Sequence, residues 1–297
     1  MKTPSHLTEL AKSQLEWSPA KRIRSMFVTR FIHHEVVSDI IAHCKYLMNR
    51  PRGVRPTGLV LAGTSGSGKT ALADALIREC SCLQATPETP ATKPILYFCM
   101  SNAREAKEVF SRLLEALGFP HISSLTADDR RKKALDLAVV ARLRLLIIDE
   151  IQDVLFHTLR QQGLALLAVK DIMNSLKIPV LALGTENARI AFEADQHLKR
   201  RFQPRELPTW QCDDYFRHFL QAYEETLPLR ERSNLGSLLT MKLIIRETKG
   251  QLSEIVERIQ RAAALAVENG QERITKDLIV RARFDFPKTD LSGYSDE

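Results

Sequence analysis

The sequence has no long apolar run. No stretch approaches the ~20 apolar residues that a membrane-spanning helix needs. The polar, basic N-terminal residues also lack the apolar core of a secretory signal peptide. We therefore expect a cytoplasmic protein without a membrane partner.

Cysteine is scarce, and its spacing does not suit a metal site. The pair Cys80-x-Cys82 is too close for the usual zinc knuckle. Cys99 falls in an apolar stretch, which is typical of a small core residue. The remaining two are Cys44 and Cys212. We expect no structural zinc.

The chain has 297 residues, which suits one large domain and a smaller one. Its net charge of +7 is unevenly placed. Residues 1–56 hold ten Lys or Arg against four Asp or Glu, whereas residues 206–297 hold thirteen against sixteen. The basic first part is compatible with a polyanionic partner, and an ordinary solvated surface explains it equally well.

The most informative motif is a complete phosphate-binding loop. A buried-strand pattern, Gly58–Ala62, precedes it, and a helical pattern, Ala71–Ile77, follows it. Glycines let the backbone N–H groups of such a loop point at phosphates, at the positive end of a helix. Lys69 is expected to reach the β- and γ-phosphates, and the Thr70 hydroxyl to bind Mg²⁺. The motif predicts ATP and Mg²⁺ as cofactors, and its residues are Gly63, Thr64, Ser65, Gly66, Ser67, Gly68, Lys69 and Thr70.

A second motif supplies two carboxylates. The apolar run Leu145–Ile148 ends in Asp149 and Glu150. Adjacent residues of a strand project in opposite directions, so the two carboxylates can serve different purposes. Asp149 is expected to hold Mg²⁺, and Glu150 to deprotonate the attacking water.

Two further groups are candidate catalytic residues. Thr185 ends the apolar run Val180–Gly184, where it is suited to hold the water or the γ-phosphate; it is also suited to cap the next helix. Arginine stabilises the charge of a transferring phosphoryl group, and ring ATPases take it from the neighbouring subunit. Arg201 is our candidate for that arginine finger, with Arg200 and Lys199 as alternatives; a basic surface cluster is the plain alternative.

The pattern of the remaining chain predicts the fold class. Five short apolar runs alternate with helical segments up to Pro208, which indicates a parallel α/β sheet covered on both faces. One long helical pattern, 22–47, precedes the first strand. Beyond residue 208 only helical patterns remain. We expect a flexible segment over 1–21, an α/β domain over 22–208, a helical lid over 209–285 and a disordered tail over 286–297. The strands are expected at Leu59–Ala62, Ile95–Cys99, Leu145–Asp149, Val180–Gly184 and Gln203–Leu207.

Taken in order, these motifs resemble those of an AAA+ ATPase, the phosphate loop and Asp149-Glu150 corresponding to its Walker A and Walker B motifs. Within that superfamily the chain is most similar to the transposition regulators of the TniB/TnsC group. The local likenesses are Arg22-Ile23, Phe31-Ile32, Leu146–Glu150, Val180–Asn187, Arg201-Phe202 and Gly250–Leu252.

The resemblance implies an ATPase that assembles as a ring or filament on duplex DNA. It would connect a target-selection protein of the TniQ type to the transposase, and hydrolysis would take the assembly apart. Some members of such systems serve CRISPR-associated transposons, and the sequence does not identify the recruiting factor. A helicase loader, or a signalling ATPase switch without DNA binding, is the alternative. The DNA-facing positions implied are Ser101–Lys107 and Ser123–Lys133, with Arg104, Lys107, Thr126, Arg130 and Arg131 as the candidates. Thr126 with Asp129 also suits a helix cap.

One position departs from the pattern of the superfamily. Many AAA+ lids carry an arginine three residues after the glycine that opens a lid helix, and here that position is Ser253. The resemblance therefore implies that this second sensor is absent, unless Arg258 or Arg261 replaces it.

Overall fold

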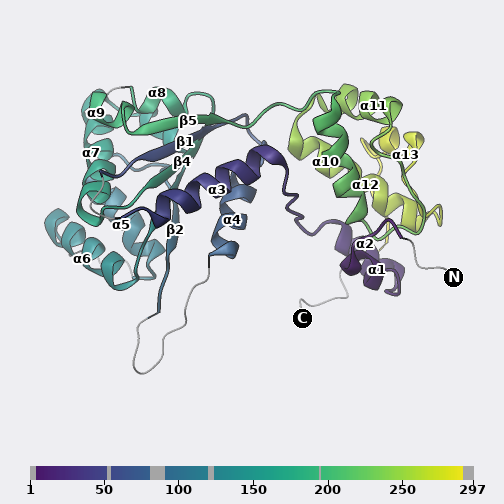
Figure 1. The fold of residues 1–297 in the computed structure, drawn as a ribbon, viewed down its shortest axis with the longest axis horizontal. Helices are drawn as coiled ribbons and strands as arrows, with labels where there is room; N and C mark the ends of the chain where they lie inside the picture. Colours follow the sequence, from purple (N-terminus) through teal and green to yellow (C-terminus); the bar gives the residue numbers. More distant parts are fainter. Residues whose placement is uncertain (1–4, 52–54, 81–90, 120–123, 194, 290–297) are drawn as a thin grey trace. The chain divides into compact units, whose positions relative to one another are not determined.

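The computed structural model describes residues 5–51, 55–80, 91–119, 124–193 and 195–289. The chain divides into two compact units (Figure 1). Glu35–Pro208 form one, called here the sheet unit; Met1–His34 and Thr209–Glu297 form the other, called the helical unit. Each is described by itself.

The sheet unit is built on five parallel strands in the order β2-β3-β4-β1-β5. Every residue of β1, β3 and β4 is buried, as expected of a parallel sheet with both faces covered. The predicted α/β fold with five parallel strands is confirmed, and their carboxyl ends meet at one edge. The strands are β1 Gly58–Ala62, β2 Ile95–Cys99, β3 Leu145–Asp149, β4 Val180–Gly184 and β5 Phe202–Glu206.

Helices fill the connections between these strands, and α3 crosses in front of the sheet in Figure 1. The main core joins the strands to α5 and α7 through side chains such as Val109, Leu113 and Ile172. The capping box of Thr158 and Gln161 fixes the start of α7. The helices are α3 Glu35–Asn49, α4 Lys69–Glu79, α5 Ala106–Ala116, α6 Ala127–Val140, α7 Leu159–Leu176, α8 Ala188–Ala191 and α9 Gln196–Lys199, with a 3₁₀ helix η1 at Ile151–Phe156.

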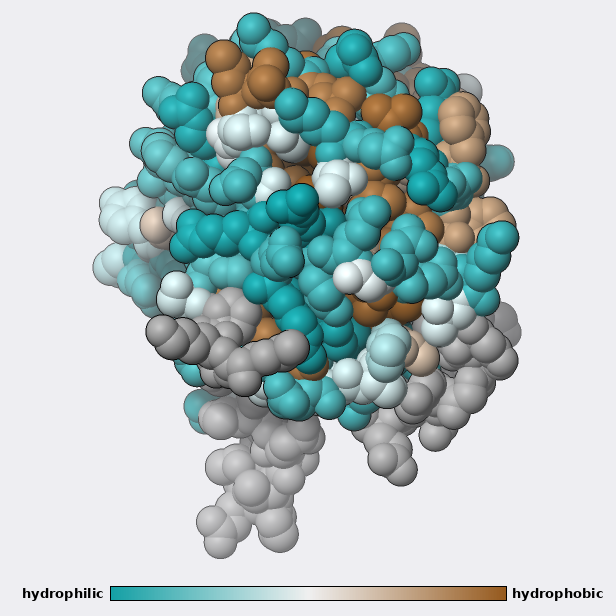
Figure 2. Space-filling model, turned by 90° about the vertical axis from the view of Figure 1, so that its right-hand side faces the viewer, coloured by the Kyte–Doolittle hydropathy of each residue, from teal (hydrophilic) through white to brown (hydrophobic). Residues whose placement is uncertain are grey.

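The helical unit contains no strand among its described residues, so the predicted C-terminal helical lid is confirmed as helical. Its core packs Ile23 and Met26 of α2 against Phe216, Tyr223 and Ile259. The helices are α1 Glu9–Gln14, α2 Pro19–Met26, α10 Asp214–Glu225, α11 Leu238–Thr248, α12 Leu252–Glu268 and α13 Lys276–Arg281. Figure 2 shows a mainly hydrophilic side of the molecule on which hydrophobic side chains gather in places.

The N-terminal residues differ from the flexible segment expected over 1–21. The side chains of Thr8 and Ser18 cap α1 and α2, and Pro19 occupies the first turn of α2. Leu7, Ala11 and Leu15 form a small buried cluster. The segment thus belongs to the helical unit, and the sheet unit begins at residue 35 instead of 22. It ends at residue 208, where the α/β domain was expected to end.

The single helical pattern over 22–47 is wrong as one element, because it spans parts of two helices and of two units. The Arg30 guanidinium donates to the carbonyl oxygens of Ser25 (2.7 Å), Met26 (2.8 Å) and Val28 (3.1 Å). It thereby satisfies carbonyl groups at the end of α2. The last carbonyl groups of any helix have no hydrogen-bond donor within that helix. The apolar spacing resumes in α3, so periodicity alone does not reveal the break.

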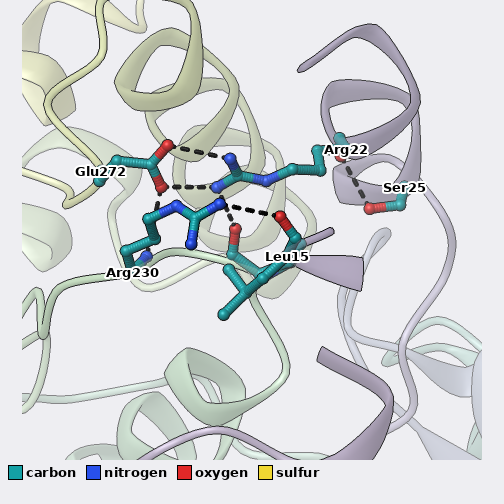
Figure 3. Close-up of polar contacts among 6 residues, drawn as sticks. Leu15, Arg22, Ser25, Arg230 and Glu272 are labelled. Carbon is teal, nitrogen blue, oxygen red and sulfur yellow. Dashed lines mark hydrogen bonds and ion pairs between the residues drawn. The ribbon is translucent and has the colours of Figure 1, made fainter. Parts of the chain in front are cut away.

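A buried arginine ties α2 to the connection between α12 and α13 (Figure 3). Arg22 donates two hydrogen bonds to the Glu272 carboxylate, at 2.9 and 2.6 Å, and one to the Pro228 carbonyl at 2.7 Å. Arg230 adds its backbone N–H to the same carboxylate (3.3 Å) and its guanidinium to the Leu15 carbonyl (3.1 Å). The N-terminal segment is therefore held by contacts up to 250 residues away in sequence.

We expect Arg22→Ala to lower the free energy of unfolding by about 3 kcal/mol, because it leaves the largely buried Glu272 carboxylate without its main partner. Burial alone would raise the pKa of Glu272, but the hydrogen bonds and charge of Arg22 lower it below its ordinary 4.5. A carboxyl group with a lowered pKa stabilises the folded state above its unfolded pKa and loses that contribution as pH falls. The difference between wild type and variant should shrink below about pH 4.5.

Urea denaturation of the full chain at pH 7 and at acid pH measures both effects. Lys21→Ala, an exposed position of the same helix, is the control. Equal losses in the two variants would contradict a structural role for the Arg22–Glu272 pair.

Candidate functional site

The loop between β1 and α4 is curled by two glycines with left-handed backbone. Gly66 has φ 73° and Gly68 has φ 96°, conformations that glycine adopts without strain. At Gly63 a Cβ atom would lie 2.6 Å from Ser67 Oγ, so a side chain there would force Ser67 to move. No side chain caps the start of α4, so its first N–H groups are available to an anion.

Lys69 lies at the centre of this loop and is buried. Its Nζ donates to the carbonyl oxygens of Gly63 (2.8 Å) and Thr64 (2.9 Å), and to Ser67 Oγ at 3.4 Å. Burial lowers the pKa of Lys69, while the charges of Glu150 and Asp149 act in the opposite direction. The ammonium group is held by weak carbonyl partners that anionic oxygens can replace.

Asp149, at the end of β3, is buried and collects three hydrogen bonds. Its Oδ2 accepts from the Tyr97 hydroxyl at 2.6 Å and from Thr70 Oγ1 at 3.4 Å, and its Oδ1 accepts from the Glu150 backbone N–H at 2.8 Å. Burial, and then the bond to Asp149, raise the pKa of Tyr97. The hydroxyl of Thr70 and the carboxylate of Asp149 therefore lie together as hard oxygen donors, which fits a Mg²⁺ ion.

Glu150 follows in a left-handed conformation with φ 52° and opens η1. Its carboxylate accepts a hydrogen bond from the buried Gln152 side-chain amide. The other end of that amide, Gln152 Oε1, accepts from the backbone N–H of Thr185 at 3.0 Å. A Cβ at Gly184 would lie 2.1 Å from this oxygen. Gln152 thus links the ends of β3 and β4 and requires a glycine beside it.

Thr185 follows β4 as expected, and it does not cap the next helix. The residue that flanks the start of α8 is Asn187, while the Thr185 carbonyl accepts from the Ala188 N–H at 2.8 Å. Of the two roles that the sequence left open for Thr185, capping of α8 is therefore not the one seen.

Tyr97 and Gln152 were not predicted as site residues. A weak signal existed for each: Tyr97 brings a hydroxyl into an otherwise apolar strand, and Gln152 follows Glu150 by two residues. The parallel register Cys99↔Asp149 brings β2 beside Asp149, and this pairing is not visible in the sequence.

Arg201, the candidate arginine finger, is held inside the sheet unit. Its side chain is buried, and NH1 donates to Asn174 Oδ1 of the same chain at 2.8 Å. Burial lowers the pKa of Arg201, and the nearby charge of Arg55 lowers it further. A finger has to extend from the surface to a neighbouring subunit. Arg200 and Lys199 are exposed, and Lys199 lies 3.7 Å from the Glu193 carboxylate.

Three of the five DNA-binding candidates form hydrogen bonds or ion pairs with other residues of the same chain. Thr126 caps α6 by accepting from the Asp129 N–H at 3.2 Å. Arg130 donates to the Leu125 carbonyl (3.0 Å) and to Ser111 Oγ (2.8 Å). Arg131 forms a two-point ion pair with a single carboxylate, that of Asp171, at 2.6 and 2.9 Å.

The remaining two candidates, Arg104 and Lys107, are exposed at the start of α5. Lys107 lies 3.2 Å from the Glu105 carboxylate, an exposed pair that contributes little to stability. Ser123, at the start of the second expected DNA-facing segment, lies outside the described residues.

Arg258 and Arg261, the possible replacements for a second sensor, also contact other residues of the helical unit. Arg258 is buried, donates to the Ile279 carbonyl at 3.3 Å and lies 3.7 Å from the Glu247 carboxylate. Arg261 pairs with Glu257 one turn away, while Ser253 is exposed.

This strand order, with a phosphate loop after β1 and two carboxylates after β3, defines a P-loop NTPase fold of the AAA+ class. The family model of the bacterial TniB protein matches residues 22–212, and the chain belongs to this family.

Several solved structures have a similar fold. The ORC2 protein of Aeropyrum pernix, in its ADPNP–ADP complexes, has a TM-score of 0.62 at 19% identity, covering 87% of this chain and 70% of that one. The Aeropyrum pernix ORC1 protein in complex with DNA has 0.61 at 19%, covering 89% and 68%. Drosophila ORC bound to DNA has 0.59 at 14%, covering 95% and 68%. At these identities the likeness shows the fold alone.

A comparison with curated proteins found no match. Among the described residues no helix is both long enough and apolar enough to span a bilayer. The same residues contain no cluster of three or more His, Cys, Asp or Glu that suits a metal ion.

Proposed function

We propose that this protein is an ATP-dependent regulator of transposition that assembles on duplex DNA, links a target-selection protein of the TniQ type to a transposase, and is taken apart by ATP hydrolysis. The observation that carries the ATPase part is the convergence of Lys69, Thr70, Asp149 and Glu150 at one edge of the sheet. Membership of the TniB family supports the link to transposition. We place this activity in the cytoplasm.

The phosphate loop and the N-terminus of α4 would hold the triphosphate, with Lys69 exchanging its carbonyl partners for phosphate oxygens. Thr70 and Asp149 would hold Mg²⁺, which supplies charge neutralisation between the phosphates when it is bound. Glu150 accepts the proton of the attacking water. Gln152 keeps the Glu150 carboxylate and the Thr185 backbone at a fixed separation.

DNA binding is proposed for the exposed Arg104 and Lys107, at the start of α5. Lysine and arginine contacts to phosphates give affinity without sequence information. Two of the similar structures, Aeropyrum pernix ORC1 and Drosophila ORC, are themselves described as complexes with DNA.

We now assign the arginine finger to Arg200, because Arg201 is buried against Asn174. Arg200→Ala should leave ATP binding intact and lower hydrolysis in the assembled state by ~10³-fold, the effect of other arginine fingers. Arg201→Ala should instead lower thermal stability, since it removes a buried partner of Asn174.

Turnover with and without duplex DNA, together with a melting curve, separates the two residues. Normal assembled turnover in Arg200→Ala, with loss in a stably folded Arg201→Ala, would return the assignment to Arg201.

Assembly on DNA tests the proposed function as a whole. Electron microscopy with an ATP analogue and plain duplex DNA should show rings or filaments, and their formation should fall steeply as salt rises. Assembly that is indifferent to DNA would contradict the proposal and favour a signalling switch. Binding to a replicative helicase in place of a transposase would favour a helicase loader.

A further inference from the structure

The helical unit contains an open cavity of about 890 Å³ that has no part in the site described above. It lies between the last turn of α10, the connection to α11, the first turn of α11 and residues 273–276, which lead into the start of α13. Its volume is in the range of ordinary ligand pockets, about 300–1,000 Å³. Neither the phosphate loop nor Asp149 or Glu150 lines it.

Three cationic side chains line this cavity, Arg232, Arg273 and Lys276, and all three are exposed. Arg273 forms a long ion pair with Glu231, at 3.7 Å. His6 also lines the cavity. Burial, and then the charge of Arg232, lower the pKa of His6, while the charges of Glu224 and Glu225 act in the opposite direction.

Two carboxylates also line the cavity, and the half-buried Glu224 is one of them. The Glu224 carboxylate already accepts the backbone N–H groups of Ser233 (2.7 Å), Asn234 (3.1 Å) and Leu235 (2.8 Å). The first turn of α11, with Ser237 as its cap, adds the positive end of a helix dipole to the same lining. The cavity therefore favours an anionic group.

The rest of the lining favours a peptide. The exposed Glu225 shares the wall with the three cations, and the amides of Gln221 and Asn234 can pair with peptide groups. Directly after Ser237, Leu238 and Leu239 are 52% and 65% exposed. Two neighbouring exposed leucines at the edge of a charged cavity are typical of a surface that contacts a protein.

We propose that this cavity is the docking site for an acidic peptide segment of a partner protein, with its carboxylates against Arg232, Arg273 and Lys276 and an apolar side chain against Leu238 and Leu239. The site would give the regulator of the proposed function a partner-binding surface, and its existence does not depend on nucleotide hydrolysis.

The test is a selection with a displayed library of random dodecapeptides on the full-length protein, followed by fluorescence polarisation with the enriched synthetic peptide. The cavity variant is Arg232→Glu with Lys276→Glu. The matched control is Lys242→Glu with Arg283→Glu, an exposed pair of the same charge in the same unit that does not line the cavity. A third variant, Leu238→Ser with Leu239→Ser, probes the apolar edge.

We expect the enriched peptides to combine Asp or Glu with an apolar residue and to bind the cavity variant ~10-fold or more weakly, as for other desolvated charge pairs. The control should bind as wild type, the leucine variant should bind more weakly, and binding should weaken with added salt. Peptides without acidic residues, or peptides that bind the cavity variant equally well, would overturn the proposal. The proposal would also be overturned if no peptide is enriched and the cavity variant, unlike the control, loses affinity for a 12-base-pair DNA duplex.

The outcome is separable from that of the proposed function. The cavity variant should keep the melting temperature and the ATP-dependent assembly on duplex DNA of the wild type, because its two positions lie outside the nucleotide site. Failure of DNA assembly in the wild type would refute the proposed function and leave the peptide result standing.

Discussion

Lys69→Ala should weaken ATP binding by at least ~100-fold, since each hydrogen bond to a charged group contributes about 1.5–3 kcal/mol and Lys69 is expected to make more than one to the phosphates. The ammonium group of Lys69 donates to the carbonyl oxygens of Gly63 and Thr64, so it lies inside the loop that is expected to bind the phosphates. No other lysine or arginine of the loop takes its place, because the motif from Gly63 to Thr70 contains none.

Binding of a fluorescent ATP analogue to the purified variant measures this loss. Lys45→Ala is the matched control: Lys45 lies in the same unit and forms an exposed ion pair with Glu79 at 2.5 Å. The variant at position 69 should keep its melting temperature, since it removes a cation whose burial is itself costly. Unchanged ATP affinity in a folded Lys69→Ala protein would refute the assignment of the loop.

The sheet was predictable because its strands carry their signal locally. β1, β3 and β4 are short and fully buried runs, and each ends in or leads directly into residues of the candidate site. β5 is harder to find, since only Phe202 of its five residues is buried. The expected strand there, Gln203–Leu207, is displaced by one residue.

The N-terminal helices were missed because their stability is not local. α1 and α2 have six and eight residues, which is too short for a helix to be stable in isolation. They are held by buried contacts such as Arg22 to Glu272. A pair separated by 250 residues leaves no pattern in a window of sequence.

The site residues differ in the same respect: those in contiguous motifs were predictable, and those that depend on distant contacts were not. The phosphate loop and the Asp149-Glu150 pair are contiguous motifs, whereas Gln152 reaches Thr185 across 33 residues and Tyr97 reaches Asp149 across 52. The basic residues around Arg201 suit a finger by type, but the sequence does not reveal that the Arg201 side chain donates to Asn174 of the same chain.

Glu150→Gln should retain ATP and lower hydrolysis by ~10²–10⁴-fold, the usual contribution of a general base. The substitution removes the proton acceptor and leaves Asp149 and Thr70, the proposed Mg²⁺ ligands, unchanged. The carbonyl oxygen of the new glutamine can still accept the hydrogen bond from Gln152, so the connection to Thr185 should persist. Assemblies on DNA should therefore form normally and fail to disassemble.

The measurement is phosphate release in a single turnover, with affinity for an ATP analogue and assembly lifetime recorded on the same protein. Gln152→Leu is the matched comparison, because it removes the partner of Glu150 and leaves the base itself. That variant should lose less activity than Glu150→Gln, since it removes only the hydrogen bond that holds the Glu150 carboxylate and leaves the carboxylate itself. Normal turnover in Glu150→Gln would reassign the base. Equal losses in Glu150→Gln and Gln152→Leu would contradict a role for Gln152 that is limited to positioning Glu150.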